Sequence, residues 1–184
     1  MDLTGKFLIA MPAMGDPRFE RSVILICSHS DEGSMGLIVN KPMPDLNFSR
    51  LLDQIGIAHG DSVAPVQIQY GGPVEPGRGF VLHGDGWQSA AGTMKVPGGL
   101  AMTATQDVLE ALARGAGPAQ AFLALGYAGW GPGQLESEIL RNDWLTADAA
   151  PDLVFGSDQG AKWAAALATL KIDPLTLSST AGRA

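Results

Sequence analysis

The side chains best suited to proton transfer lie in two separate parts of the chain. His83 ends an apolar segment and precedes Gly84 and Asp85, so the Asp85 carboxylate can orient the imidazole of a general base. His29 follows another apolar segment in the same way. A histidine at such a position can equally form a structural hydrogen bond with a loop carbonyl, and the sequence leaves both roles open.

Complete catalytic and metal-binding signatures are missing from the sequence. No Gly-x-Ser-x-Gly elbow holds a serine nucleophile, and no Gly-x-x-x-x-Gly-Lys-Ser/Thr loop can cradle a phosphate. The three histidines lack metal-ligand spacing, although distant histidines and carboxylates can still converge on folding. We therefore assign no catalytic residue, no metal and no cofactor, and an enzyme is the less favoured interpretation.

A glycine-rich segment is the most distinctive part of the chain. Residues 125–136 read Leu-Gly-Tyr-Ala-Gly-Trp-Gly-Pro-Gly-Gln-Leu-Glu, with four glycines around Tyr127 and Trp130. Glycine permits left-handed backbone angles and close approach of other groups, so we expect a shaped loop with a concave aromatic patch at the start of a helix. Pro132 removes an amide donor and Glu136 adds negative charge, which argues against an anion site there.

Glu136 and Glu138 lie in the helix predicted after this loop. Two residues correspond to about 200° around an α-helix, so the two carboxylates point to different sides and do not form a shared acid–base pair. A capping, solvated or partner-facing role is favoured for both.

The elements that must position these side chains follow from hydrophobic periodicity. Short apolar runs bounded by Gly, Pro or Asp predict strands over residues 7–10, 23–27, 36–40, 66–70, 79–83, 100–104, 122–125 and 153–155. Apolar residues spaced by three and four predict helices from 48 to 55, between 106 and 115, from 135 to 141 and between 158 and 173. The expected N-terminal signals are Asn47, a Thr103–Gln106 capping box and Asp158.

Length and composition predict one folded domain. The chain has 184 residues, 46% of them hydrophobic, which suffices for a continuous core. The formal charge of −7 arises from 19 acidic and 12 basic residues, and the basic residues form no block, which disfavours direct nucleic-acid binding. No apolar stretch approaches the ~20 residues of a membrane span, and the N-terminus lacks the pattern of a signal peptide. With Cys27 as the single cysteine, we expect a cytoplasmic protein.

Motifs distributed in order over nearly the whole chain resemble the bacterial AlgH/YqgE family. They include Phe7-Leu-Ile-Ala-Met-Pro12, Asn40-Lys-Pro42, Gly71-Gly-Pro-Val74, Gly79-Phe-Val-Leu-His83, Leu125-Gly-Tyr-Ala-Gly-Trp130 and Gly133-Gln-Leu-Glu136. The combination is much more specific than any one motif. Two positions depart from the family pattern, because Ser28 stands where relatives often carry Glu and Arg183 where the pattern often has His.

The resemblance implies a cytosolic α+β protein whose single domain, residues 1–184, has a mixed, partly closed β-sheet flanked by helices. We expect the small, polar tail at 176–184 to be loose. One family name comes from a proposed role in regulating alginate synthesis, so the resemblance also implies a regulator of transcription. Because no DNA-reading helix is evident, we expect indirect regulation through a bound protein or small molecule.

The leading hypothesis is a binding surface built from several loops. Its expected members are His29, Asn40, Lys41, Pro42, Gly71, Gly72, Pro73, His83, Tyr127, Gly129, Trp130, Gln134 and Glu136. Tyr and Trp often anchor binding, and glycine-rich turns leave room beside them. The rival hypothesis is an enzyme in which His29, His83 and the carboxylate of Asp85 or Glu136 share one pocket. Direct DNA regulation is a third hypothesis.

Overall fold

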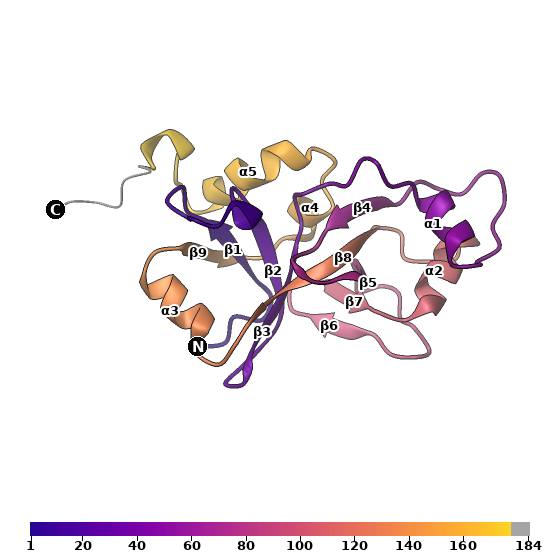
Figure 1. Cartoon of the computed structure of the whole chain (residues 1–184), viewed down its shortest axis with the longest axis horizontal. Helices are drawn as coiled ribbons and strands as arrows, with labels where there is room; N and C mark the ends of the chain where they lie inside the picture. Colours follow the sequence, from indigo (N-terminus) through magenta and orange to yellow (C-terminus); the bar gives the residue numbers. More distant parts are fainter. Residues whose placement is uncertain (178–184) are drawn as a thin grey trace.

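The chain folds around one mixed β-sheet, shown in the computed structural model of Figure 1, which describes residues 1–177. Within these residues the sheet has nine strands in the order β6-β7-β5-β8-β3-β2-β1-β9, with β4 added beside β8. The strands are β1 Lys6–Ala10, β2 Val23–Ser30, β3 Gly33–Ile38, β4 Gln67–Tyr70, β5 Val74–Gly84, β6 Met94–Val96, β7 Leu100–Thr103, β8 Ala121–Trp130 and β9 Trp144–Asp148.

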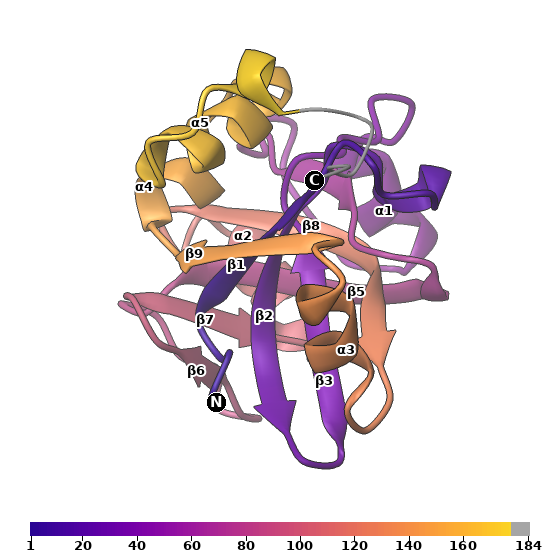
Figure 2. The ribbon, with the colours of Figure 1, turned by 90° about the vertical axis from the view of Figure 1, so that its left-hand side faces the viewer.

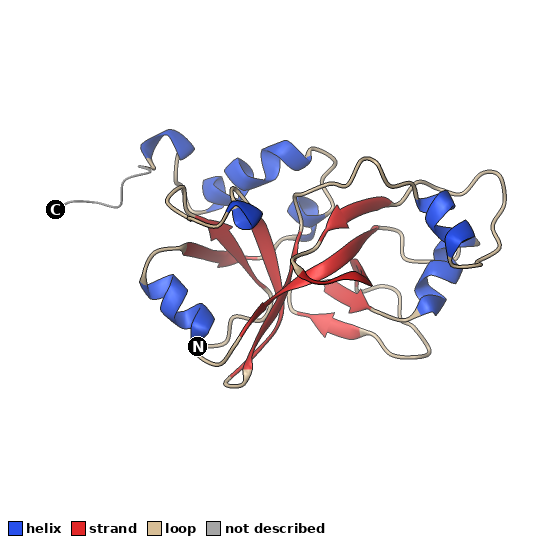
Figure 3. Cartoon of the chain, viewed as in Figure 1, coloured by secondary structure: helices blue, strands red, loops and turns tan. Residues whose placement is uncertain are grey.

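β8 joins the two halves of the sheet. Its last residues pair antiparallel with β3, whereas its first residues pair antiparallel with β5 and parallel with β4. The sheet is therefore mixed, and it curls into a half-barrel with helices packed against it, as Figures 1 and 3 show. The prediction of an α+β fold with a mixed, partly closed sheet flanked by helices is confirmed.

Helices cover both faces of the half of the sheet that contains β1 and β2. The α-helices of the described residues are α1 Phe48–Gln54, α2 Gln106–Ala113, α3 Gln134–Leu140, α4 Pro151–Val154 and α5 Lys162–Thr169. Strand side chains alternate between faces, so one set from β1 and β2 packs with α4 and α5 while the other packs with α3. A separate cluster joins β4, β5 and β8 to α1 and α2. None of these helices is long and apolar enough to cross a membrane.

The glycine-rich segment from Gly126 to Trp130 is strand, not the expected loop. Gly126 has a φ of +74°, and a Cβ atom there would lie 2.3 Å from the Gly72 carbonyl oxygen. A Cβ atom on Gly72 would in turn lie 2.1 Å from the Tyr127 carbonyl carbon. These glycines therefore allow one backbone segment to cross directly over another within the sheet.

Several predicted boundaries change as well. The strand predicted at 153–155 is wrong, because Pro151 begins the short helix α4 there. The Thr103–Gln106 capping box is also wrong, because Thr103 ends β7 and α2 begins after Thr105, which makes no side-chain cap bond. The caps at Asn47 and Asp158 are confirmed, with Asp158 capping the 3-10 turn that precedes α5. Arg183 and most of the tail predicted at 176–184 lie outside the described residues.

Candidate binding cleft

Two cross-strand rows separate the candidate residues onto opposite faces of the sheet. Ser28 of β2 pairs with Met35 of β3, which pairs with Gly129 of β8. The adjacent row contains His29 and its partner Ser34, which pairs with Trp130. Neighbouring residues in a strand point to opposite faces, so these two rows face opposite sides of the sheet.

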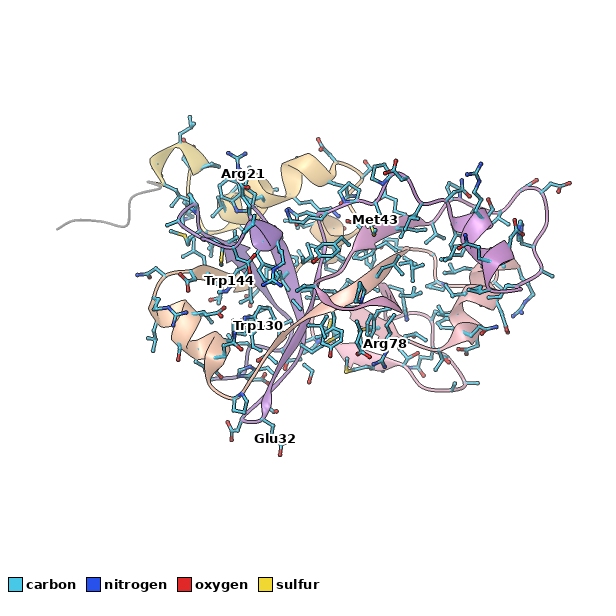
Figure 4. The ribbon with its side chains drawn as sticks, in the orientation of Figure 1. Arg21, Glu32, Met43, Arg78, Trp130 and Trp144 are labelled. Atoms are coloured by element: carbon cyan, nitrogen blue, oxygen red, sulfur yellow. The ribbon has the colours of Figure 1, made fainter. Side chains whose placement is uncertain are left out.

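A cleft of about 600 Å³ opens on the Gly129 face, between the β2–β3 hairpin, the end of β8 and the start of β5. This volume is in the range of small-molecule sites. Figure 4 shows Glu32 at the tip of the hairpin and Arg78 beside β5. The lining residues are Ser28, Ser30, Glu32, Gly33, Ser34, Met35, Val74, Arg78, Phe80, Tyr127, Gly129 and Trp130.

The β5 wall of the cleft is a stack of a guanidinium group and two aromatic rings. The Arg78 guanidinium carbon lies 5.0 Å from the centroid of the Phe80 ring, a distance at which cation and ring attract each other. The Phe80 ring meets the Tyr127 ring edge to face, with centroids 5.8 Å apart. Arg78 also contacts Glu75, with 3.4 Å between Nη1 and Oε2, and both side chains are about half exposed.

Gly129 keeps the floor of the cleft open. It is exposed, and a Cβ atom on it would lie 3.4 Å from the edge of the Tyr127 ring and 3.9 Å from Val74 Cγ2. Any side chain at this position would therefore occupy space beside the ring. Gly33 acts at the rim, since a Cβ atom there would lie 2.5 Å from the Trp130 carbonyl oxygen and would force the hairpin away from β8.

His29, Ser34 and Glu136 meet on the opposite face, beside α3. Ser34 Oγ lies 2.7 Å from His29 Nδ1, and His29 Nε2 lies 2.9 Å from the Met1 carbonyl oxygen and 3.4 Å from Glu136 Oε1. In the tautomer that donates from Nε2, Nδ1 accepts the hydroxyl proton of Ser34. In this arrangement Ser34 has the position of a nucleophile, His29 that of its general base, and Glu136 and the Met1 carbonyl orient the base.

Trp130 and Gln134 are held by a carboxylate on α3. Glu138 Oε2 accepts hydrogen bonds from the indole nitrogens of Trp130 at 2.9 Å and Trp144 at 2.8 Å, and its other oxygen accepts from Gln134 at 3.0 Å. Figure 4 shows the two tryptophans close together, and Figure 2 shows α3 against the sheet beside β2 and β3. Trp130 borders the cleft but is only 7% exposed and packs with Leu135 of α3 and Trp144, so it adds little to an open aromatic patch with Tyr127.

Asn40, Lys41 and Pro42 lie at the exit of β3, away from the cleft. Asn40 Oδ1 accepts a bond from the Val23 amide at 2.9 Å, and its Nδ2 donates to the Arg21 carbonyl at 2.8 Å. Lys41 Nζ donates to the Glu20 carbonyl at 2.8 Å, and burial lowers the pKa of this ammonium group. Pro42 forms an isolated bridge with Gln69. This cluster fixes the turn before β2.

The connection from β4 to β5 consists of Gly71, Gly72 and Pro73, and it passes against the backbone of β8 at Gly126 and Tyr127. The Gly71 amide donates to Leu125, and the Gly71 carbonyl accepts from Ile38, each at a distance of 2.8–2.9 Å. A Cβ atom on Gly71 would lie 2.2 Å from the Gly126 carbonyl oxygen. These residues therefore position β8 and the start of β5 without lining the cleft.

His83 is a fully buried residue of β5, and it pairs with Ala101 of β7. Its Nδ1 donates to the Gly84 carbonyl at 2.7 Å, and its Nε2 accepts from Thr103 Oγ1 at 2.8 Å. Burial lowers the pKa of this imidazole, while the bond to Gly84 acts in the opposite direction. The expected orientation of His83 by Asp85 is absent, because both ring nitrogens are already occupied, and His83 does not share a pocket with His29.

Nine of the twelve lining residues were not among the predicted site residues, and Arg78 and Phe80 are the two of these that form the β5 wall. Arg78 belongs to a bulge, since β5 advances from Val74 to Gly79 while its partner β8 moves only from Tyr127 to Leu125. The available signal was an isolated arginine between two glycines just before a predicted strand. Within residues 1–177, no three His, Cys, Asp or Glu side chains gather in a metal-binding arrangement.

Comparison with known proteins places the chain in one family. The AlgH-like family model matches residues 7–175. UPF0301 proteins of Cereibacter sphaeroides and Ruegeria pomeroyi are 58% and 60% identical, with full coverage of both chains in each comparison. The solution structure of the AlgH protein from Pseudomonas aeruginosa has a TM-score of 0.79 at 41% identity, covering 100% of this chain and 97% of that one.

A crystal structure of a Corynebacterium diphtheriae protein shares the fold at 22% identity. Its TM-score is 0.72, and the comparison covers 97% of this chain and 93% of that one. The family model and the close relatives each span nearly all of the sequence. The chain therefore belongs to the AlgH-like family.

Proposed function

We propose that this protein binds a small molecule in the cleft beside Tyr127 and Gly129 and thereby regulates transcription indirectly. A protein partner that distinguishes the free from the occupied cleft would carry the effect to gene expression. The formal charge of −7 is in line with a role that does not require direct contact with DNA. The proposed place of action is the cytoplasm, in line with the free, buried thiol of Cys27.

The open floor at Gly129 is the observation that carries this proposal. An exposed glycine in a strand leaves a cleft of about 600 Å³ between an aromatic wall and the β2–β3 hairpin. Glycine weakens the interior of a strand, because ordering its backbone costs more entropy and it has no side chain to pack. A glycine in a strand with open space beside it therefore suggests that another group approaches there. Ser28 and Ser30 add hydroxyl groups that can orient a ligand.

Closing this floor tests the proposal. The full chain is purified from its native host, and native mass spectrometry measures retained small molecules in the parent, in Gly129→Leu and in Gly60→Leu. Gly60 is the matched control, because it is exposed and a Cβ atom there meets nothing within 4 Å. We expect a retained molecule in the parent and the control but not in Gly129→Leu. Identical spectra for all three folded proteins would contradict the proposal.

A second candidate function, an enzyme of unknown reaction, rests on the Ser34–His29–Glu136 cluster. Ser34 Oγ would attack the carbonyl carbon of an ester while its proton passes to His29 Nδ1, and the imidazolium would give this proton to the departing oxygen as the ester C–O bond breaks and an acyl-serine forms. Water would then hydrolyse the acyl-serine, and the Glu136 carboxylate and the Met1 carbonyl would orient Nε2 throughout. Hydrolysis of p-nitrophenyl acetate by the parent, Ser34→Ala and His29→Asn tests this reaction. A rate above buffer that both substitutions abolish would support it, and equal rates for all three would reject it.

A further inference from the structure

Arg78, Phe80 and Tyr127 form a wall of the cleft whose positive charge and aromatic rings restrict the chemical class of the ligand. We propose that the cleft binds a small molecule that combines a flat ring with a carboxylate or phosphate group. This inference rests on the binding function proposed above and adds the chemical class of the ligand.

Arg78 supplies the site for the anionic group. The bulge between Val74 and Gly79 lifts it out of the strand ladder, and Glu75 within the bulge has a φ of +46°. The guanidinium carbon lies 5.0 Å from the centroid of the Phe80 ring, and this contact holds the group on the β5 side of the cleft. Its one carboxylate contact among the described residues, to Glu75, is long at 3.4 Å and uses one of five N–H donors. The remaining donors can bind a carboxylate or phosphate in bidentate geometry.

Tyr127 and Gly129 supply the site for the flat ring. The Tyr127 ring stands edge to face against Phe80, so its orientation is fixed from behind. A Cβ atom on Gly129 would lie in van der Waals contact with the ring edge at 3.4 Å, so glycine at this position leaves that ring edge uncovered on the cleft side. A planar group in the cleft can therefore contact the Tyr127 ring and the bare backbone of Gly129 together.

The opposite charges on the two sides of the cleft determine the orientation in which an anionic ligand binds. Among the lining residues, Arg78 is the one cation and Glu32, at the tip of the hairpin, is the one carboxylate (Figure 4). An anionic group is therefore attracted to the β5 side and repelled from the hairpin tip. The exposed hydroxyls of Ser28 and Ser30 lie on the hairpin side and can bond to neutral polar groups of the ligand.

Three probes of equal ring size test the ligand class. The ¹⁵N-labelled full chain is titrated with 1-naphthoate, 1-naphthyl phosphate and neutral 1-naphthamide, and Kd is taken from the amide shifts of Gly129 and Val74. One charge-assisted contact corresponds to about tenfold in Kd. We expect at least one anionic probe to bind about tenfold more tightly than 1-naphthamide, and the tighter of the two identifies the anion.

Substitution of the arginine separates this inference from the general binding function. In Arg78→Gln the preference for the anion should disappear while the Kd of 1-naphthamide stays the same, and Arg50→Gln, an exposed arginine on α1, should behave as the parent. Equal Kd values for charged and neutral probes at the Gly129 amide would overturn the ligand class and leave the binding function standing. A preference that survives Arg78→Gln, or shifts confined to amides outside the cleft, would also overturn it.

Discussion

Tyr127 and Trp130 lie on opposite faces of β8. Tyr127 packs with the cluster that contains Phe80, whereas Trp130 packs under α3 with Trp144. We therefore predict that Trp130→Ala costs about 3–5 kcal/mol of unfolding free energy, as for other buried aromatics. Tyr127→Ala should cost about 1 kcal/mol. Urea denaturation measures both, and equal losses would contradict the separation of the two faces.

Glu138 should be more important for stability than its position on a short helix suggests. Its removal leaves the indole N–H groups of Trp130 and Trp144 without their acceptor. We expect Glu138→Ala to lower the unfolding free energy by about 2–4 kcal/mol, because each unsatisfied buried donor costs about 1–3 kcal/mol. Glu110→Ala on α2, which loses one contact with the exposed Gln106, is the control and should change it by less than about 0.5 kcal/mol. Similar values for the two variants would argue against the bridge.

The crossing of Gly72 over β8 should tolerate no side chain. Gly72 has a φ of +153°, and its added Cβ atom would lie 2.1 Å from backbone carbon. Gly72→Ala should therefore cost more than about 3 kcal/mol, because neither backbone can move without breaking the sheet. Gly77→Ala, where a Cβ atom meets nothing within 4 Å, should be close to neutral. Circular dichroism during thermal unfolding compares the two, and a folded Gly72→Ala with the parental Tm would refute this packing.

Stability should fall in mildly acidic solution because of His83. Burial holds the pKa of this imidazole below its ordinary value of 6.5, so the unfolded chain takes up a proton as the pH falls below 6.5 while the folded chain does not. Unfolding is therefore favoured as pH decreases through this window, by at most about 1.4 kcal/mol per pH unit. His83→Gln should make the dependence of the unfolding free energy on pH shallower.

His59 provides the opposite case. The Gly60 carbonyl and then Asp53 raise its pKa, so it contributes stability below pH 6.5 that is lost as the pH rises through its folded-state value. His59→Gln should therefore steepen the loss of stability toward acid. If His83→Gln and His59→Gln shift the slope in the same direction, the assignment of the two histidines is wrong.

The core strands could be predicted from the sequence because their apolar runs are continuous. The run from Val23 to Cys27 is buried on both faces of the sheet, so its side chains are apolar whichever face they point to, and the strand appears in the sequence as an unbroken apolar run. β9 was missed because Trp144–Asp148 has no such run, and it pairs with β1 only through long-range contacts. The short edge strand β6 was missed for the same reason.

The site was harder to predict because its geometry depends on one strand assignment. With residues 125–130 taken as a loop, Tyr127 and Trp130 could share a patch, but strand alternation places residues three apart on opposite faces. Arg78 enters the cleft only through the bulge in β5, which arises from pairing with a strand about 50 residues later and leaves little trace in the local sequence.

The most direct test of the account replaces the chromosomal gene and measures RNA levels genome-wide. Strains carrying Gly129→Leu, Gly60→Leu and a deletion are compared at equal protein abundance for the two variants. If the open cleft at Gly129 carries the regulatory function, Gly129→Leu reproduces the RNA changes of the deletion and Gly60→Leu matches the parent. A Gly129→Leu strain that matches the parent while the deletion differs from it would contradict the account.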